Sequence, residues 1–269
     1  MMFFAQGWIQ CESTVCQQWL AAKHRLRWAV IRRLLPCPVL ARHAECSFLL
    51  SEDDSGGWPC NQLIDLSVHA IQEARHIDLT PISARMAGRF SYPDSLINVW
   101  PGEHYRLLAG LCRTLVPDIV VEIGTGEGLS ALSMLASLPP SAKLVTFDVI
   151  PWHRYPRVCF LPEDFQGGRL KQITGDLSNE KFFATQAELL SQAELLFLDA
   201  PKDGCFEPRF LSLLRNLKRE RTTVLVLDDI RQLNMLKVWR ELALPRLDMT
   251  SFGHFTGTGL ALLAVESGG

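Results

Sequence analysis

Acidic side chains recur at the ends of short apolar runs from residue 118 onward. They are Glu122 in DIVVEIG, Asp148 in AKLVTFDV, Asp176 in LKQITGD, Asp199 in AELLFLDA, and Asp228 with Asp229 in TTVLVLDD. If these runs are parallel strands, their carboxyl ends meet at one edge of the sheet, where open sheets bind ligands. Several like charges there are costly unless cations or many donors compensate them. The pattern favours a cationic ligand, a metal ion, or both, although single Asp residues also serve helix caps and turns.

A glycine-rich turn follows the first of these runs, in VVEIGTGEGLSALSMLASL at residues 120–138. Its glycines are spaced G-x-G-x-G, whereas a dinucleotide site needs G-x-G-x-x-G, and Leu129 stands where the third glycine would be. A P-loop is excluded because no G-K-[ST] follows. The turn leaves room for a nucleoside, and Ser130 offers a hydroxyl in the first turn of the next helix. Asp148 lies where an acidic residue holds a ribose, which NAD and adenosine cofactors share.

From residue 118 the sequence alternates strand-like and helix-like segments. Apolar runs predict strands at 118–124, 142–149, 170–176, 193–200 and 222–229, and helical spacing predicts helices at about 129–138, 179–191, 206–219 and 231–242. Strands this apolar, each followed by a helix, indicate a doubly wound α/β sheet whose strands are mostly parallel. In RLDMTSFGHFTGTGLALLAVE two strand-like runs share a Gly/Thr turn, so we expect the last strand to run antiparallel.

Composition restricts the class of partner and the location. A chain of 269 residues that is 48% hydrophobic can bury a sizeable core. With 27 basic and 29 acidic side chains the net charge is -2, so we expect a small-molecule partner and no nucleic acid. No apolar stretch reaches the roughly 18 residues of a spanning helix, and the N-terminal order of charges does not fit a signal peptide. The eight cysteines lack metal or disulfide spacing, so we expect reduced thiols in the cytoplasm.

Residues 1–60 differ from the rest of the chain. They contain five of the eight cysteines, and residues 23–43 mix basic and apolar side chains at roughly helical spacing. Such a segment could lie on a membrane, bind a partner, or pack on the main domain with its Arg side chains reaching water, and we favour packing. The acidic, Gly-rich stretch at 51–59 predicts a linker. We expect a helical extension at 1–60, acting as a lid or homodimer element without stable membrane anchoring, and a main domain at 61–269.

Five motifs, in order and at compatible spacings, resemble those of class I S-adenosylmethionine-dependent methyltransferases. The motifs are VVEIGTGEGLSA, LVTFDV, ITGD, LFLDAPKD and VLVLDDI, and INVWPGEHYRLLAGL at 97–111 is similar to the segment that closes over the cofactor. Within that family the likeness is to the metal-dependent catechol and caffeoyl-CoA O-methyltransferases, over about residues 90–265. The resemblance implies a Rossmann-like methyltransferase fold with seven strands, and S-adenosylmethionine as cofactor. It also implies a divalent cation, expected to be Mg²⁺, and methylation of a small-molecule hydroxyl, for example on a natural-product intermediate.

The resemblance also implies roles for individual residues. For the cofactor they are Glu122 and Gly124 around the methionine part, Gly126 in the turn, Ser130 on its carboxylate, Asp148 on the ribose, Asp176 or its neighbours on adenine, and Asp199 at the next strand end. Asp199, Asp228 and Asp229 would ligate the cation, and Lys202 would be the general base that takes the hydroxyl proton. The family usually has Asp-Asn where this chain has Asp228-Asp229, which adds a negative charge to the ligand set.

Plainer interpretations exist for several of these residues. Lys202 could be a solvent-exposed turn lysine, and Asp228-Asp229 could cap a helix that starts near Arg231. The Gly/Thr content of GHFTGTG at 253–259 is what a hairpin turn requires, with His254 as a candidate for substrate contact.

Other parts of the sequence leave the substrate open. Glu103 and His104 are candidates for the substrate side or for a helix start. The aromatics of 150–168 could line an acceptor pocket or simply pack. Two alternatives to a methyltransferase stay open, namely an NAD-linked oxidoreductase and a non-catalytic protein that keeps the fold.

Overall fold

The computed structural model describes residues 59–91, 97–98 and 104–265 of the chain. The extension predicted for residues 1–60, except its last two residues, and the substrate-side candidate Glu103 lie outside the described residues. The domain boundary predicted near residue 60 therefore stays a prediction.

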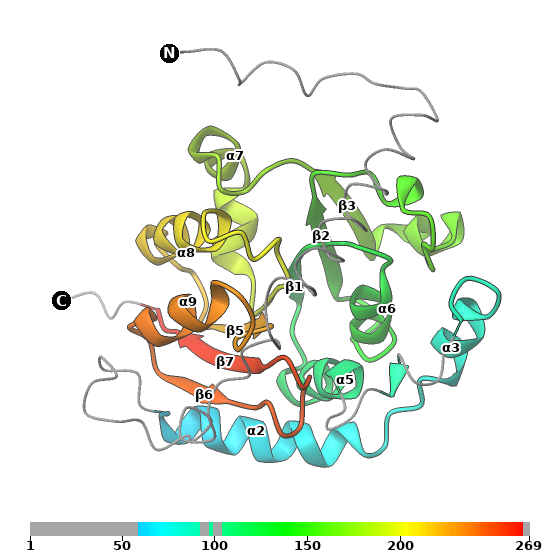
Figure 1. Cartoon of the computed structure of the whole chain (residues 1–269), viewed down its shortest axis with the longest axis horizontal. Helices are drawn as coiled ribbons and strands as arrows, with labels where there is room; N and C mark the ends of the chain where they lie inside the picture. The colour runs from blue at the N-terminus through cyan, green and yellow to red at the C-terminus, as the bar shows by residue number, and fades with distance from the viewer. Residues whose placement is uncertain (1–58, 92–96, 99–103, 266–269) are drawn as a thin grey trace, which may run out of the picture. The chain divides into compact units, whose positions relative to one another are not determined.

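A seven-stranded sheet runs through the centre of the described chain, in the order β3-β2-β1-β4-β5-β7-β6 (Figure 1). Its parallel strands are β1 (Ile119–Ile123), β2 (Lys143–Asp148), β3 (Leu170–Thr174), β4 (Leu195–Leu198) and β5 (Thr223–Asp228). The last two strands are β6 (Arg246–Asp248) and β7 (Thr258–Leu263), and β7 pairs antiparallel with both β5 and β6. The predicted doubly wound α/β sheet, mostly parallel with an antiparallel C-terminal hairpin, is confirmed.

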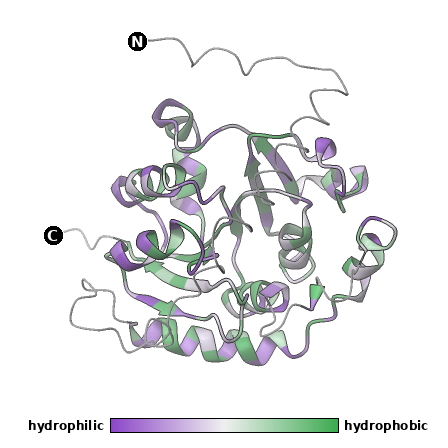
Figure 2. Cartoon of the chain, viewed as in Figure 1, coloured by the Kyte–Doolittle hydropathy of each residue, from purple (hydrophilic) through white to green (hydrophobic). Residues whose placement is uncertain are grey.

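Helices cover both faces of the sheet because successive strand residues point to opposite sides. In β4, Leu195 and Phe197 join one apolar core, and Leu196 and Leu198 join the other. The first core packs against α2 (Asn61–Ala74), α3 (Thr80–Met86), α5 (His104–Leu115) and α6 (Leu129–Leu135). The second packs against α7 (Glu180–Gln192), α8 (Phe206–Asn216) and α9 (Met235–Glu241). The central strands β4, β5 and β7 are accordingly mostly hydrophobic, whereas the helices also carry hydrophilic residues (Figure 2).

The helix expected to start near Arg231 begins later than the sequence predicted. After β5 the backbone makes turns in which Gln232 N–H donates to the Asp229 carbonyl and Met235 N–H donates to the Gln232 carbonyl. Asp229 and Leu233 have positive φ values of 58° and 47°, which a helix cannot contain. The interpretation of Asp228-Asp229 as an N-cap pair is therefore wrong, and both residues are available for other chemistry. Helices α6 and α8 also end about three residues before their predicted ends.

Among the helices of the described residues, none is both long enough and apolar enough to cross a membrane.

Candidate active site

The acidic strand ends do meet at one edge of the sheet, where β1 and β4 approach each other closely. Gly124 N–H donates to the Phe147 carbonyl, and Asp199 N–H donates to the Ile123 carbonyl, both over 2.8 Å. A Cβ atom at Gly124 would lie only 2.0 Å from the Asp199 carbonyl oxygen, and the φ of Gly124 is +100°. Only glycine fits this position, so the turn brings the cofactor candidates of β1 against the ligand candidates that follow β4.

Glu122 is a fully buried carboxylic acid beneath the glycine turn. The Ser130 hydroxyl donates to Glu122 Oε1 over 2.5 Å, whereas Oε2 has no hydrogen-bond partner among the described residues. Burial raises the pKa of Glu122 to about 8, and the hydroxyls of Ser130 and Thr146 act in the opposite direction. The structure thus pairs the two residues that were expected to contact the methionine part of the cofactor, and it leaves one buried oxygen unpaired.

Asp148 organises the loop above the glycine turn. Its Oδ2 atom accepts hydrogen bonds from the N–H groups of Thr125 and Gly126, at 2.9 and 3.3 Å, and from the Tyr155 hydroxyl at 2.9 Å. Its Oδ1 atom accepts from Ile150 N–H over 2.9 Å. The carboxylate therefore lies beside the turn, as a ribose ligand should, and it also fixes the turn itself.

Asp176 lies at the same edge but faces solvent. Its Oδ1 atom accepts hydrogen bonds from the backbone N–H and the hydroxyl of Ser178, at 2.8 and 2.7 Å. Asn179 then caps α7 by accepting from the N–H groups of the first helical turn. The side chain of Asp176 shapes the turn before α7, and its expected contact with adenine stays a prediction.

Lys202 bridges two of the expected metal ligands rather than facing solvent. Its Nζ atom donates to Asp199 Oδ1 and lies 2.7 Å from Asp229 Oδ2, and its side chain is 15% exposed. Burial lowers the pKa of Lys202, but the carboxylates of Asp199, Asp229 and Asp228 outweigh it and raise the pKa above its ordinary value. The interpretation of Lys202 as an exposed turn lysine is wrong, because the ammonium neutralises part of an acidic cluster.

Asp228 is the most buried carboxylate of this cluster. Its Oδ1 atom has no hydrogen-bond partner within the described part of the chain and lies 3.7 Å from Nδ1 of His104, which also has none there. Burial raises the pKa of Asp228, and the charges of Asp229 and Asp199 raise it further. For His104 burial acts in the opposite direction: it lowers the pKa to about 3, so this imidazole is neutral. Two buried polar groups thus face each other without a hydrogen bond.

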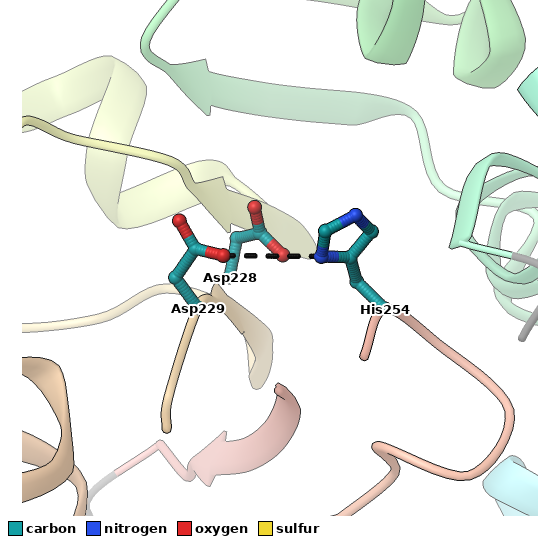
Figure 3. A group of neighbouring side chains, drawn as sticks. All are labelled: Asp228, Asp229 and His254. Atoms are coloured by element: carbon teal, nitrogen blue, oxygen red, sulfur yellow. Dashed lines mark ion pairs between the residues drawn. The ribbon is translucent and has the colours of Figure 1, made fainter. Parts of the chain in front are cut away.

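His254 brings the β6–β7 loop to the same cluster, as Figure 3 shows. One ligand atom each of Asp228, Asp229 and His254 lies within 4.8 Å of the others, and His254 Nδ1 is 3.9 Å from Asp229 Oδ1. Burial lowers the pKa of His254, against the opposing effect of Asp229 and Asp199. For Asp229, burial raises the pKa, but the charge of Lys202 prevails and the net shift is downward. The loop predicted as a plain hairpin turn therefore also contributes a side chain to the site.

The aromatic residues of 150–168 mostly pack on one another. Trp152 stacks on Phe165 with ring centroids 4.9 Å apart, and Phe160 lies edge-on to Phe165 at 5.3 Å. Phe160 is 2% exposed, and all three rings belong to the core on the α6 side of the sheet. These three rings support the loop over the glycine turn. Of the two roles that the sequence left open for them, lining an acceptor pocket or packing, they take the packing role.

Two curated proteins, from Mycobacterium sp. strains KMS and MCS, are each 32% identical to this chain over 107 residues and are each named "Putative O-methyltransferase". The similarity is to O-methyltransferases. It agrees with the resemblance carried by the five sequence motifs. The matched stretch covers 39% of this chain and 46% of each relative, so the chain spans about half the length of the curated relatives it matches. No protein-family profile matches the chain.

Solved structures with a similar fold include two methyltransferases. One, from Geobacter sulfurreducens, has a TM-score of 0.49 and 18% identity, over 69% of this chain and 90% of the other. The O-methyltransferase TomG of Streptomyces achromogenes, solved with S-adenosylmethionine, has a TM-score of 0.45 and 19% identity, over 75% and 90% of the two chains.

Two residues of the site were missed by the sequence analysis. Glu207, 1% exposed in the first turn of α8, accepts the Lys202 backbone N–H at Oε1 over 2.6 Å. This bond holds Lys202 at a φ of +56°, a conformation that costs non-glycine residues about 1–3 kcal/mol. Tyr155 was missed as the partner of Asp148. An acidic residue in the first turn of the helix after LFLDAPKD was the available signal for Glu207, and nothing in the sequence indicated Tyr155.

Proposed function

We propose that this protein transfers a methyl group from S-adenosylmethionine to a hydroxyl oxygen of a small molecule, assisted by a divalent cation and by Lys202 as the base. One observation carries the proposal. Asp199, Asp228, Asp229 and Lys202 form a single acidic cluster beside the glycine turn, joined through the contact of Gly124 with the Asp199 backbone. The 32% identity to O-methyltransferases supports the same reaction class.

The turn has features that fit an adenosine cofactor. Gly126 has no atom within 4 Å of the place where a Cβ would stand, so the backbone there is open to a ligand. Beneath it Glu122 Oε2 is buried without a hydrogen-bond partner among the described residues. We propose that Glu122, Gly124 and Ser130 hold the methionine part, and that Asp148 holds the ribose. When bound, S-adenosylmethionine supplies an electrophilic methyl group on a positively charged sulfur.

The cluster also fits a divalent cation. Carboxylates are the ligands that Mg²⁺ and similar cations prefer, and the unpaired Oδ1 atom of Asp228 is the kind of buried oxygen that a cation would satisfy. We propose Asp199, Asp228 and Asp229 as the candidate ligands. When bound there, a divalent cation would orient the acceptor hydroxyl and stabilise its developing negative charge.

The position of Lys202 supports its proposed role as the base. Its Nζ atom already contacts Asp199 and Asp229, so an acceptor hydroxyl at the cluster would come within its reach. In the present arrangement the carboxylates keep the amine protonated, since they raise its pKa. Base action requires these charges to be offset, and Glu207 meanwhile holds the Lys202 backbone in place. Once unprotonated, Nζ would accept the hydroxyl proton, and transfer of the methyl group from sulfur to that oxygen would release the cofactor as neutral S-adenosylhomocysteine.

Binding of S-adenosylhomocysteine tests the cofactor, and metal dependence tests the cation. We expect calorimetric titration of the purified chain with S-adenosylhomocysteine to show one site. Methyl transfer to a broad panel of hydroxyl compounds should stop on chelation and in Asp228→Ala. The absence of any S-adenosylhomocysteine binding would refute the proposal, and activity that survives both chelation and Asp228→Ala would refute the role of the cation.

The alternatives predict different results. An NAD-linked oxidoreductase would change nicotinamide fluorescence on mixing, but Leu129 occupies the position that its glycine fingerprint requires. A non-catalytic protein would bind S-adenosylhomocysteine and methylate no hydroxyl in the panel. The similarity to O-methyltransferases favours neither alternative.

A further inference from the structure

The three side chains in Figure 3 differ from the ligand set implied by the sequence motifs, because a histidine is among them. Asp228, Asp229 and His254 each offer one ligand atom, and these atoms lie within 4.8 Å of one another. Asp199 is not in this group, and its Oδ1 atom is held by Lys202. The group joins the end of β5 to the β6–β7 loop, 25 residues further along the chain.

The nitrogen that faces the carboxylates carries a lone pair. The backbone N–H of Thr256 lies 3.4 Å from His254 Nδ1 in hydrogen-bonding geometry, and a backbone N–H can only donate. Nδ1 is therefore an acceptor, and the proton of a neutral ring sits on Nε2. The Thr256 hydroxyl also contacts Nδ1 and can serve there as the donor. The lone pair of Nδ1 thus faces the two carboxylates, and a cation bound there would replace the Thr256 donors as its partner.

The carboxylates are left with oxygens for such a ligand group. Lys202 occupies Oδ2 of Asp229. Oδ1 of Asp229 accepts one hydrogen bond from Gln232 Nε2 over 3.3 Å, and it is the atom 3.9 Å from His254 Nδ1. Asp228, 8% exposed, has Oδ1 without a hydrogen-bond partner in the described ranges. Behind it His104, 6% exposed, points Nδ1 at the same oxygen from 3.7 Å, again without a hydrogen bond there. One further buried and unpaired polar group, His104 Nδ1, thus faces the cluster from a second side.

We infer that Asp228, Asp229 and His254 form a cation site with two oxygen donors and one nitrogen donor, selective for a first-row transition-metal ion over Mg²⁺. The inference rests on the proposed function only in placing a cation at this edge of the sheet. Mg²⁺ prefers an all-oxygen shell, whereas imidazole suits Fe, Ni, Cu and Zn ions, and Mn²⁺ is the weakest-binding member of the same row. The histidine therefore adds a nitrogen donor to the carboxylates of the proposed ligand set, and this donor sets which metal the protein takes.

Metal binding by the full chain, measured with MnCl₂ and MgCl₂ alone, tests the inference without any acceptor. Calorimetry should show Mn²⁺ binding at least about tenfold tighter than Mg²⁺. Pulsed electron paramagnetic resonance of the Mn²⁺ complex should show an imidazole nitrogen. In His254→Gln that nitrogen signal should vanish and the Mn²⁺ affinity should fall by about tenfold or more, with a smaller change for Mg²⁺.

Matched variants separate the outcomes. His69→Gln, at an exposed position of α2, should leave the nitrogen signal and both affinities unchanged. A nitrogen signal that persists in His254→Gln, and is lost instead in His104→Gln, would overturn the assignment, as would equal Mn²⁺ affinities of wild type and His254→Gln. Titration of each variant with S-adenosylhomocysteine reports folding and cofactor binding independently. Failure of wild type to bind that ligand would refute the proposed function and leave the Mn²⁺ result intact.

Discussion

Gly124 and Gly126 offer a matched pair of substitutions, because both have positive φ but only one is crowded. An alanine in the left-handed region costs about 1–2 kcal/mol, and both variants carry that cost. At Gly126, with φ +50°, the new methyl group would meet no atom within 4 Å. At Gly124 it would stand 2.0 Å from the Asp199 carbonyl oxygen, so β1 and β4 would have to separate at this end.

The expected loss of stability differs accordingly. Gly126→Ala should lower the free energy of unfolding by about 1–2 kcal/mol. Gly124→Ala should lower it by about 1–3 kcal/mol more, which is the usual cost of overpacking a well-packed region. A total near 4 kcal/mol would be a large part of the roughly 5–15 kcal/mol that stabilises a typical protein. Urea denaturation of both variants beside wild type, without ligand, measures the difference.

Cofactor binding should show a separate effect at Gly126. If the open space there receives S-adenosylmethionine, the alanine methyl group would weaken S-adenosylhomocysteine binding by about tenfold or more, which is about 1.4 kcal/mol, in a folded protein. Saturating ligand, at about 100 times its Kd, stabilises a protein by about 2.7 kcal/mol, so the loss is also visible in denaturation with ligand. Wild-type affinity in a folded Gly126→Ala would refute the placement of the cofactor, and equal stability of the two variants would refute the close approach at Gly124.

Three further substitutions test the charged groups of the site. Lys202→Met should lower the free energy of unfolding by about 3 kcal/mol, the low end of the range for a buried ion pair, because Asp199 is 37% exposed. Added Mn²⁺ should restore part of this stability in urea denaturation. An unchanged stability would contradict the neutralising role of Lys202. Glu122→Gln should flatten the pH dependence of stability between pH 4.5 and 8. In that window the folded wild type keeps a proton on Glu122 that the unfolded chain releases, so the wild type loses stability as the pH rises. An unchanged slope at pH 5 to 8 would contradict the raised pKa of Glu122. Glu207→Ala should reduce turnover and leave S-adenosylhomocysteine affinity unchanged, because it frees the backbone of Lys202 and not the glycine turn, and full activity would exclude this positioning role.

The sheet could be predicted from the sequence because each strand is an apolar run with its own turn signal. β4 is buried along its whole length, and in the sequence it is the uninterrupted run LLFL before an aspartate. The antiparallel direction of β7 could be predicted as well, because no helical segment separates it from β6. The start of α9 could not be predicted, since the turns after β5 depend on positive φ angles at Asp229 and Leu233, which these residue types do not indicate.

The site was predicted in part. The meeting of the carboxylates at the strand ends could be predicted because parallel topology alone brings them to one edge, whereas Lys202 was named through the resemblance of LFLDAPKD to a known motif. The position of His254 beside Asp228 and Asp229 and the contact of Glu207 with the Lys202 backbone could not be predicted, since a loop conformation in one case and a helix orientation in the other decide where these side chains point. The contact of Ser130 with the cofactor stays a prediction, and the hydrogen bond that its hydroxyl donates to Glu122 joins two residues of the same motif.

β7 lies between β5 and β6 although it follows both in the chain. Its pairing sets Thr258 opposite Asp228, and the loop just before it carries His254. During synthesis the glycine turn and all five parallel strands leave the ribosome before this segment. The glycine turn can therefore form before the group of Asp228, Asp229 and His254, which is complete only when β7 pairs between β5 and β6.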